Sequence, residues 1–441
     1  MADTFGSTTP WAEPAAYRGL PSPYYNESHR RLRKAAREWT DKYLMDVPFE
    51  WEEETKVVDP EVYKQAGKDG LVAALAFGPR ALKEYASKDG TVFGGVKAEE
   101  WDWFHFFILN DEIHRCGSLG VPQGLFGGLQ IGCPPLYHYG SPALQKCFLP
   151  DILSGKKRIC LAITEPEAGS DVKNLSTEAK LSEDGKHFIV NGTKKWITNG
   201  IYSDYLTTAV RTSGKAGEHA GISLLLIPTD LEGVSRRKML MSGQHCAGTT
   251  FVSFEDVKVP VENLIGEKDK GWQMIMNNFL SERIMIVSAA HRLARCCIED
   301  AMEYAHKRRV FGKLLIESEV IRNKFAHMAR EVEAQQAWIE SILFQLSHLS
   351  KPEGDQRLGG TTALLKAHSG ITLELCAREA VQVMGGIAHT RGGVAERVER
   401  IRRDVKGVAI PGGSEEIMLD TGVKQEIKLA AKLGRGVGAK L

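Results

Sequence analysis

The chain has 441 residues, of which 43% are hydrophobic and 26% are charged, which is enough for a sizeable core in one large domain or in two to three smaller ones. Its 57 basic and 56 acidic residues leave a formal charge of +1, so nothing draws the protein in general to nucleic acid or to a membrane surface. No apolar stretch reaches the roughly 18–20 residues of a membrane-spanning helix. The eight cysteines form no CxxC pair. We therefore expect reduced thiols of an intracellular protein, with no metal site and no disulfide framework.

Residues 1–24 are predicted to form a flexible N-terminal arm. Acidic residues precede the first arginine, Arg18, and no apolar leader is present, which argues against a mitochondrial presequence. Prolines break up the segment and disfavour a packed element. They lie at Pro10, Pro14, Pro21 and Pro23.

Residues 25–158 are predicted to form an N-terminal helical domain. Apolar residues recur at spacings of three and four in PEVYKQAGKDGLVAALAF and in WDWFHFFILNDEIHRCG, which is the period of a helix with one buried face. Ser141-Pro142 is a favourable helix start, because serine caps the first turn and proline fits its first position.

Residues 159–267 have a different pattern and are predicted to form a β domain. Short runs rich in β-branched and aromatic residues, such as HFIVNGTKKWIT and GISLLLIPT, are separated by glycine, aspartate and serine. The helical period returns over 268–433, where the polar stretch KPEGDQRLGG (351–360) is expected to be an inter-helix loop. The predicted fold class is α+β: a helical domain, a β domain and a second helical domain.

Residues 434–441 are predicted to be a flexible tail, because three of them are glycines. The chain ends in Ala439-Lys440-Leu441, which is similar to the Ser-Lys-Leu signal that a peroxisomal import receptor reads. We therefore predict a peroxisomal location, with the cytoplasm as the alternative.

Two segments of the predicted β domain suit a flat polar ligand. AITEPEAGSD (162–171) is a strand that ends in a Gly/Ser turn, whose N–H and hydroxyl groups can bind a polar ring or a phosphate. In NGTKKWITNG (191–200), Trp196 and Thr198 are two apart and would share one face of a strand, which suits a stacked aromatic cofactor. The alternatives are a plain surface turn and a half-buried core tryptophan.

Two segments of the C-terminal half could hold a phosphate or a close ligand. In YAHKRRVFGKLLIESEVI (304–321), Arg308 and Phe311 would lie on one helical face, and the guanidinium could bind a pyrophosphate. The glycine pair in QVMGG lets a ligand or another backbone approach closely. A solvated helix end and a plain helix C-cap are the respective alternatives.

Six segments stand in one order along the chain: TEPEAGSD, KKWITNG, FEDVKVP, KRRVFGK, QVMGG and GGSEEIM. In this order they resemble the acyl-CoA dehydrogenase family over about residues 27–430. The resemblance implies a helical domain, a β-barrel-like middle domain and a C-terminal four-helix bundle, with FAD bound non-covalently. It also implies a homodimer or homotetramer, because neighbouring subunits share the FAD sites.

The resemblance implies roles for particular residues of this chain. The isoalloxazine side would be lined by Ile163, Thr164, Ser170, Trp196, Ile197 and Thr198. The pyrophosphate and adenine would be held by Arg308, Phe311, Gln382, Gly385, Gly386, Ser414 and Glu416, with several of these from a neighbouring subunit. The thioester substrate would meet Ser170, Arg283, Gly412 and Gly413.

The chain departs from the common family pattern at the catalytic position. Many members place a glutamate where this chain has Gly412, in the segment IPGGSEEIM. Glu282 lies instead in the helical run FLSERIMIVSAA with apolar neighbours on its own face, and burial raises the pKa of a carboxyl toward that of a working base. Isovaleryl-CoA and long-chain members likewise place the base at this helical position, followed by an arginine. We therefore predict that Glu282 is the catalytic base. Smaller departures are Ala388 for a glycine and Ser318-Glu319 for a His-Gln pair.

The predicted reaction is α,β-desaturation of an acyl-CoA, with an electron-transfer flavoprotein or oxygen as acceptor. Two rivals share the fold. One is an acyl-CoA oxidase that uses oxygen directly, although such oxidases are much longer chains. The other is a non-catalytic DNA-binding relative, which adds a basic extension. The last 18 residues here carry only five basic groups against one acid.

Overall fold

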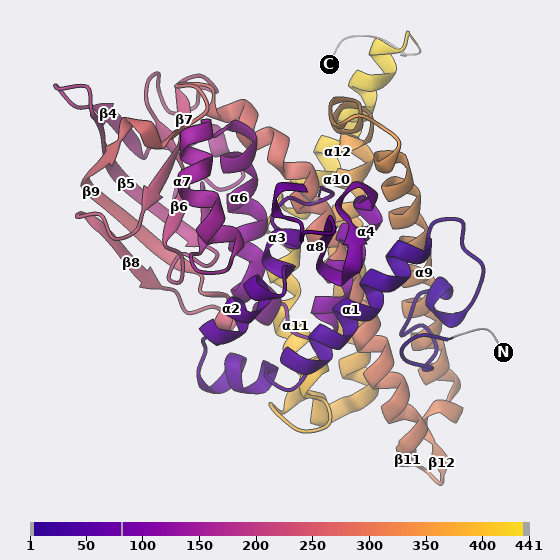
Figure 1. Cartoon of the computed structure of the whole chain (residues 1–441). Helices are drawn as coiled ribbons and strands as arrows, with labels where there is room; N and C mark the ends of the chain where they lie inside the picture. The colour runs from indigo at the N-terminus through magenta and orange to yellow at the C-terminus, as the bar shows by residue number, and fades with distance from the viewer. Residues whose placement is uncertain (1–3, 81–82, 435–441) are drawn as a thin grey trace.

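The computed structural model describes residues 4–80 and 83–434, and it shows helices on both sides of an inserted β domain (Figure 1). In the described part of the chain, seven α-helices and a small hairpin, β1–β2, precede the β domain. Side chains of Asp59 and Ser141 cap two of the helices, each with a proline at the next position, as expected for helix starts. The helices are α1 Glu27–Tyr43, α2 Pro60–Lys68, α3 Leu71–Leu75, α4 Trp103–Ile113, α5 Gly120–Pro122, α6 Gly128–Tyr139 and α7 Pro142–Leu153, and the hairpin strands are β1 Thr91–Val92 and β2 Val96–Lys97.

The β domain is built on one eight-stranded sheet, ordered β10-β7-β6-β4-β5-β9-β8, with β3 paired to β6. Strands β6 and β7 are almost wholly buried, whereas much of β5 and β9 alternates between buried and at least partly exposed positions. This alternation matches a sheet with one face in a core. The strands are β3 Ile159–Ala162, β4 Glu178–Leu181, β5 His187–Ile197, β6 Tyr205–Arg211, β7 Ile222–Pro228, β8 Val234–Lys238, β9 Thr250–Pro260 and β10 Leu264–Ile265.

Long helices form the C-terminal domain. Helix α8 spans 37 residues, and α9 and α10 follow it in an up-and-down arrangement, so that α8 and α10 run in the same direction (Figure 1). The hairpin β11–β12 projects from the turn between α8 and α9. The elements are α8 Gly271–Lys307, β11 Arg309–Val310, β12 Lys313–Leu314, α9 Glu319–Ser347, α10 Lys351–Met384, α11 Glu396–Ala409 and α12 Glu415–Lys432. The predicted α+β fold of helical, β and helical parts is thus confirmed.

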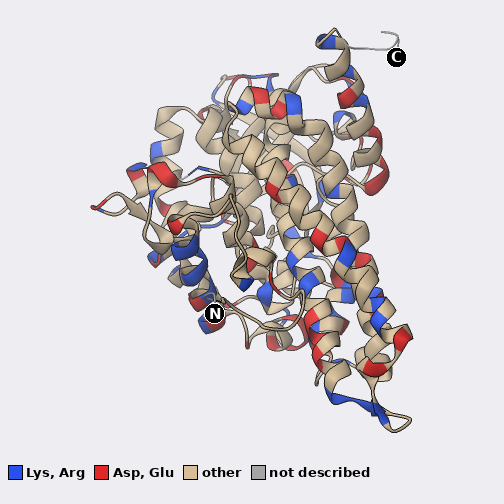
Figure 2. Ribbon diagram, turned by 90° about the vertical axis from the view of Figure 1, so that its right-hand side faces the viewer, with Lys and Arg blue, Asp and Glu red and all other residues tan. Residues whose placement is uncertain are grey.

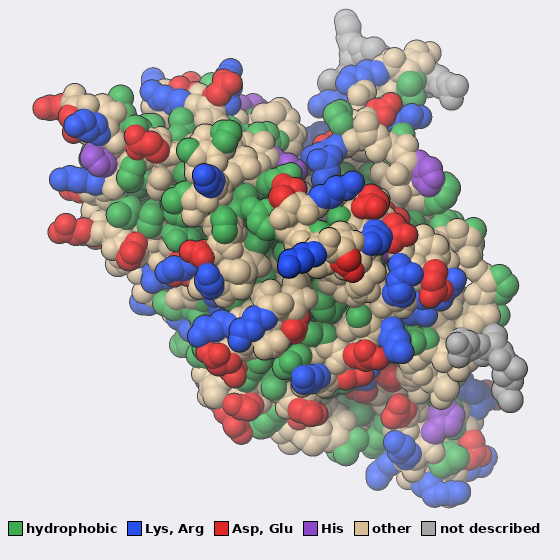
Figure 3. Space-filling model, viewed as in Figure 1, with side chains coloured by type: hydrophobic (Ala, Val, Ile, Leu, Met, Phe, Trp, Pro, Cys, Tyr) green, Lys and Arg blue, Asp and Glu red, His purple; other side chains and the backbone are tan. Residues whose placement is uncertain are grey.

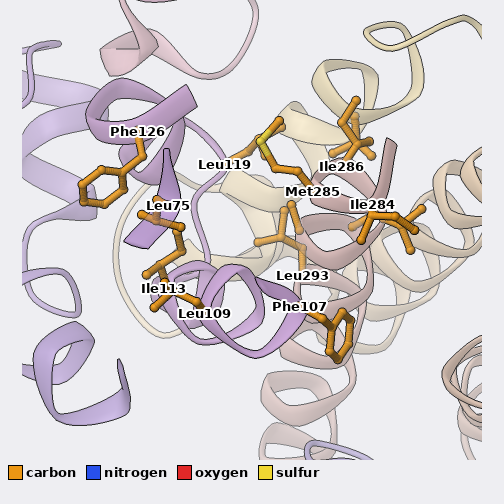
Figure 4. Packing of buried hydrophobic residues seen from close by; sticks show 14 of the residues in the cluster. Leu75, Phe107, Leu109, Ile113, Leu119, Phe126, Ile284, Met285, Ile286 and Leu293 are labelled. Atoms are coloured by element: carbon orange, nitrogen blue, oxygen red, sulfur yellow. The ribbon is translucent and has the colours of Figure 1, made fainter. Parts of the chain in front are cut away.

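One apolar core joins the two helical parts. The buried side chains of α4, among them Phe107 and Ile113, lie close to Ile284 and Leu293 of α8 (Figure 4). Helix α4 is buried along nearly its whole length, because other helices surround it. The core therefore fixes α8, the helix that carries Glu282, against the N-terminal part of the molecule.

The prediction of a flexible N-terminal arm is wrong for residues 4–24. Tyr17 is buried, and Ala15–Arg18 form a 3-10 helix. The buried Glu13 carboxylate pairs with Arg37 of α1 at 2.8 Å and with Arg292 of α8 at 3.0 Å. Proline disfavours regular helix and strand interiors, but it does not prevent tight packing of an irregular segment.

The expected loop at residues 351–360 is instead the start of α10. Ser350 and Glu353 form a capping box, with Pro352 in the first turn, a combination that starts helices. The glycines Gly359 and Gly360 serve close packing: a Cβ on either would lie 2.7 Å from a side-chain oxygen of α12. Glycine is common in loops, so the stretch was predicted to be one. Here the two glycines instead allow close contact between helices.

All eight cysteines are free, and seven of them are buried. Within 4–80 and 83–434, no helix is long and apolar enough to cross a membrane. The predicted targeting tripeptide Ala439-Lys440-Leu441 lies outside the described residues.

Candidate active site

Glu282 lies near the start of α8 with its carboxyl group withdrawn from solvent. Its Oε2 atom is buried and has no hydrogen-bond partner among the residues that the structure describes. Burial raises the pKa of Glu282 to about 7, against the opposing effect of the nearby cations Arg283 and Lys366. A carboxylate with this pKa can accept a proton near neutral pH.

Gly412 faces this carboxyl group from the turn between α11 and α12. Its φ of +68° is left-handed, a conformation that favours glycine. A Cβ on Gly412 would lie 3.8 Å from Glu282 Oε1 and 2.6 Å from Ile286 Cδ1. The position where many relatives carry a glutamate and the Glu282 carboxyl therefore open on the same space, and Ile286 occupies part of it.

Lys366 of α10 completes this group, and sequence reasoning missed it. Its side chain is buried, and its Nζ donates to the carbonyl oxygens of Ala409 at 2.7 Å and of Gly413 at 2.5 Å. Burial lowers the pKa of Lys366 to about 8. A lone lysine in the apolar run ALLKAHSG was the available signal, but a single charge in a helix is usually solvated.

Arg283, predicted to meet the substrate, adjoins Glu282 on α8. Its guanidinium lies 5.8 Å from the Phe279 ring centroid, and its Nε is buried without a partner among the described residues. A half-buried guanidinium with unused donors can bind an anionic or carbonyl oxygen.

A buried ion pair locks together the two β-domain segments predicted to line the flavin. Lys194 Nζ lies 2.7 Å from Glu165 Oε1 and donates to the Ile163 carbonyl at 2.9 Å. The Lys195 N–H donates to the Thr164 carbonyl at 2.8 Å. The pair therefore holds segment 162–165 beside the end of β5, and sequence reasoning overlooked it although both motifs had been identified.

The predicted strand alternation of Trp196 and Thr198 is wrong. Strand β5 ends at Ile197, is irregular between Lys194 and Ile197, and has Trp196 at a left-handed φ of +58°. Trp196 is 44% exposed, whereas Ile197 packs into the β-domain core and offers a ligand only its backbone. The exposed indole remains available for stacking.

The segment after β5 is fastened to the N-terminal helical part. Asn199 accepts from the Gly128 N–H at 2.8 Å and donates to the Gln123 carbonyl at 2.9 Å. Thr198 lies beside Gly127, whose Cβ position would be 3.4 Å from the Thr198 methyl group. The Trp196–Thr198 segment thus borders a junction between domains.

These residues fit FAD by their chemistry. Trp196 offers an exposed ring, and Ser170 lies exposed in the loop after β3. Ser414 immediately precedes the 18-residue helix α12 and makes no side-chain cap bond, and the free N–H groups of a helix N-terminus attract phosphate. Glu416 is exposed in the first turn of α12.

The remaining predicted cofactor residues lie at the other end of the helical domain. Helix α8 continues for 25 residues beyond Glu282, or about 38 Å at 1.5 Å per residue, before it reaches Arg308. The prediction that Arg308 and Phe311 share one helical face is wrong, because α8 ends at Lys307 and the chain then turns into a hairpin. Phe311 lies at the turn of this basic β11–β12 hairpin and is fully exposed (Figure 2). Since α10 runs parallel to α8, its final residues lie at this end too. Gln382 is one of them, and Gly385 and Gly386 follow directly in the short 3-10 helix Gly385–His389. One subunit therefore does not bring this group to its own Glu282.

Comparison with known proteins identifies relatives over most of the chain. Models of the acyl-CoA dehydrogenase N-terminal, middle and C-terminal domains match residues 26–156, 160–257 and 269–426. The acyl-CoA dehydrogenase apdG of Emericella nidulans is 46% identical, covering 96% of each chain. The acyl-CoA dehydrogenase AFT10-1 of Alternaria alternata is 45% identical, covering 97% of this chain and 98% of that one. An acyl-CoA dehydrogenase structure from Geobacillus kaustophilus is 26% identical, with a TM-score of 0.80 over 92% of this chain and all of that one.

Proposed function

The chain belongs to the acyl-CoA dehydrogenase family, FAD-dependent oxidoreductases of acyl-CoA thioesters, and we propose that it desaturates its acyl-CoA at the α,β bond with Glu282 as catalytic base. The observation that carries this proposal is that Glu282 and Gly412 lie close together. The carboxyl group is buried, has an oxygen without a partner among the described residues and a pKa raised to about 7, and faces the residue that replaces the usual glutamate.

The proposed chemistry begins with removal of the α proton. An α C–H of a thioester is a weak acid, so the carbonyl oxygen needs hydrogen bonds that strengthen as enolate charge develops. The Gly412 N–H donates to no described residue, and it is our candidate donor to this oxygen. Glu282 Oε2 then takes the proton.

FAD, when bound, supplies the acceptor for the β-hydrogen, which leaves as a hydride. Trp196 and the 162–165 segment would hold and orient the flavin ring, and the start of α12 at Ser414 would face its phosphates. The turn before α12 therefore carries both Ser414, which would lie at the cofactor phosphates, and Gly412, which would lie at the substrate. Arg283 would bind the CoA portion of the substrate.

Assembly into at least a dimer is part of the proposal. Arg308 is the C-cap of α8, and the hairpin with Phe311 that follows projects from the body of the subunit, about 38 Å along α8 from Glu282. An exposed ring and guanidinium at this distance suit contact with the cofactor of a neighbouring subunit.

We propose that the protein is a dehydrogenase, which passes electrons to a flavoprotein or another acceptor, and not an oxidase. The two fungal relatives at 45% and 46% identity, AFT10-1 and apdG, are both named acyl-CoA dehydrogenases. A DNA-binding role is disfavoured by the balanced formal charge of +1, and basic and acidic side chains are interspersed on the face that Figure 3 shows. A peroxisomal location remains a prediction from residues 439–441.

The test is a screen of acyl-CoAs of different length and branching with a ferrocenium acceptor, with and without oxygen. We expect dye reduction with at least one acyl-CoA and formation of the trans-2-enoyl product. Equal turnover with oxygen alone would favour the oxidase, and no flavin reduction by any acyl-CoA would contradict the proposed reaction.

A further inference from the structure

Lys366 is a buried cation whose hydrogen bonds end on the turn that faces Glu282. Two of its three N–H groups donate to Ala409 O and Gly413 O, on either side of Gly412. Its Cε and the Oε1 of Glu282 both lie within 4 Å of the point where a Cβ would stand on Gly412. The lysine therefore reaches the turn and the carboxyl group at the same place.

We infer that Lys366 is a positioning residue, whose buried ammonium fixes the 409–413 turn against Glu282 and favours the anionic form of that carboxylate. This inference rests on the proposed role of Glu282 as base. It assigns Lys366 no contact with the reacting atoms.

The 409–413 turn needs hydrogen bonds from outside, because its own glycine-containing backbone does little to fix its conformation. Gly412 and Gly413 both have positive φ, at +68° and +105°. Glycine loses more conformational entropy than any other residue when its backbone is fixed. The carbonyl groups of Ala409 and Gly413 would be costly to bury without donors. Two hydrogen bonds from one buried ammonium satisfy carbonyls on both sides of Gly412, and so hold its N–H in one orientation.

The charges around Glu282 come from three helices. Arg283 adjoins it on α8, Lys366 approaches from α10, and Glu415 of α12 acts on Lys366. Both cations oppose the effect of burial on the Glu282 pKa. Removing the Lys366 charge should therefore raise this pKa above about 7, and a nearby opposite charge typically shifts a carboxyl by about one unit or more.

The experiment titrates Glu282 directly, without turnover. Infrared difference spectra of the oxidised holoenzyme would follow the C=O stretch of the protonated carboxyl, assigned by its loss in Glu282→Gln. Lys366→Gln removes the charge but keeps N–H donors, and Lys366→Met removes both. Lys406→Met is the matched control, because Lys406 is exposed on α11 and pairs with Glu374 at 2.9 Å.

We expect the carboxyl midpoint to rise by about one unit in both Lys366 variants and to stay unchanged in Lys406→Met. The acid limb of the flavin-reduction rate should move with it, which lowers the rate at pH 7 about fivefold. At pH values above both midpoints, Lys366→Met should stay slower than Lys366→Gln, since only the amide can still hold the turn.

An unshifted carboxyl midpoint in a folded, FAD-containing Lys366→Gln protein would overturn the inference, whatever the rate. A shifted midpoint in a protein that no acyl-CoA reduces would instead leave the inference standing and defeat the proposed reaction. Thermal unfolding and FAD content show whether each variant is folded.

Discussion

The molecule contains two buried lysine–glutamate neighbourhoods that differ in whether the charges meet. In the β domain, Lys194 and Glu165 form a direct ion pair at 2.7 Å, and Glu165 also accepts from the N–H groups of Ser176 and Thr177. In the helical domain, Lys366 spends its hydrogen bonds on backbone carbonyls, and Glu282 has an oxygen with no partner among the described residues.

The pKa values follow from this difference. Burial alone would raise the pKa of Glu165, but Lys194 and the N–H donors lower it to about 2. Burial raises the pKa of Glu282 to about 7, because nearby cations compensate only in part. A fully satisfied carboxylate is a structural element that cannot accept a proton at neutral pH, whereas a buried and unsatisfied one is a base.

The largest expected effect of breaking this contrast is on catalysis. Glu282→Gln should lower the rate of flavin reduction by an acyl-CoA about 10³-fold, the scale for loss of a positioned general base. Folding and FAD content should be retained, because the amide keeps the size and polarity of the side chain. Stopped-flow flavin absorbance measures the rate. A reduction rate within a few-fold of normal would show that another group is the base.

Glu165→Gln should produce the reverse pattern, with a large loss of stability. It leaves the Lys194 ammonium buried without its counter-ion, which typically costs about 3–5 kcal/mol. Denaturant unfolding at pH 7.5 measures this loss, and weaker FAD retention should accompany it because the 162–165 segment is released. A variant as stable as the wild type would show that the ion pair contributes little to stability.

The pH dependence of stability should differ in sign between the two carboxyls. Glu165 has a lowered folded-state pKa, so its contribution is present above the unfolded value of about 4.3 and is lost as the pH falls toward 2. Glu282 has a raised folded-state pKa, so stability is lost as the pH rises from about 4.3 to about 7.

Relative to the wild type, Glu282→Gln should therefore gain stability on going from pH 5 to pH 8, on the order of 2 kcal/mol. Unfolding curves of both proteins at the two pH values give the difference. A stability difference that does not change with pH would indicate an ordinary, solvated pKa for Glu282.

The smallest expected effect is on stability, from substitutions that separate the close contact of Gly412 with Ile286 from the cost of its left-handed φ. Gly412→Ala should destabilise the protein by about 1–2 kcal/mol because alanine disfavours the left-handed φ. A further loss should follow because the new Cβ would lie 2.6 Å from Ile286 Cδ1, which must move. Gly185→Ala is the control, with a φ of +69° and open space around its Cβ position. Equal losses in the two variants would show that the contact with Ile286 is unimportant. For the same reasons, Gly412→Glu is not expected to restore activity to Glu282→Gln.

Local patterns in the sequence predicted the order of helical and β segments, because hydrophobic period and turn residues act over short distances. They also suggested Glu282, through its apolar neighbours and its contrast with Gly412. The packing of residues 4–24 was not predictable in this way, since Glu13 pairs with Arg292, far along the chain. The roles of Lys194 and Lys366 were hidden likewise, because a lysine's partners decide whether it is solvated or buried.

The central claim, that Glu282 removes the α proton, is tested most directly by hydrogen exchange without oxidation. The substrate is 3,3-dimethylbutanoyl-CoA, which has α hydrogens but no β hydrogen to lose as hydride. In D₂O, the wild-type holoenzyme should exchange the α hydrogens, faster as the pH rises through about 7, and Glu282→Gln should exchange them about 10³-fold more slowly. Equal exchange by the two folded, substrate-binding proteins would contradict the account.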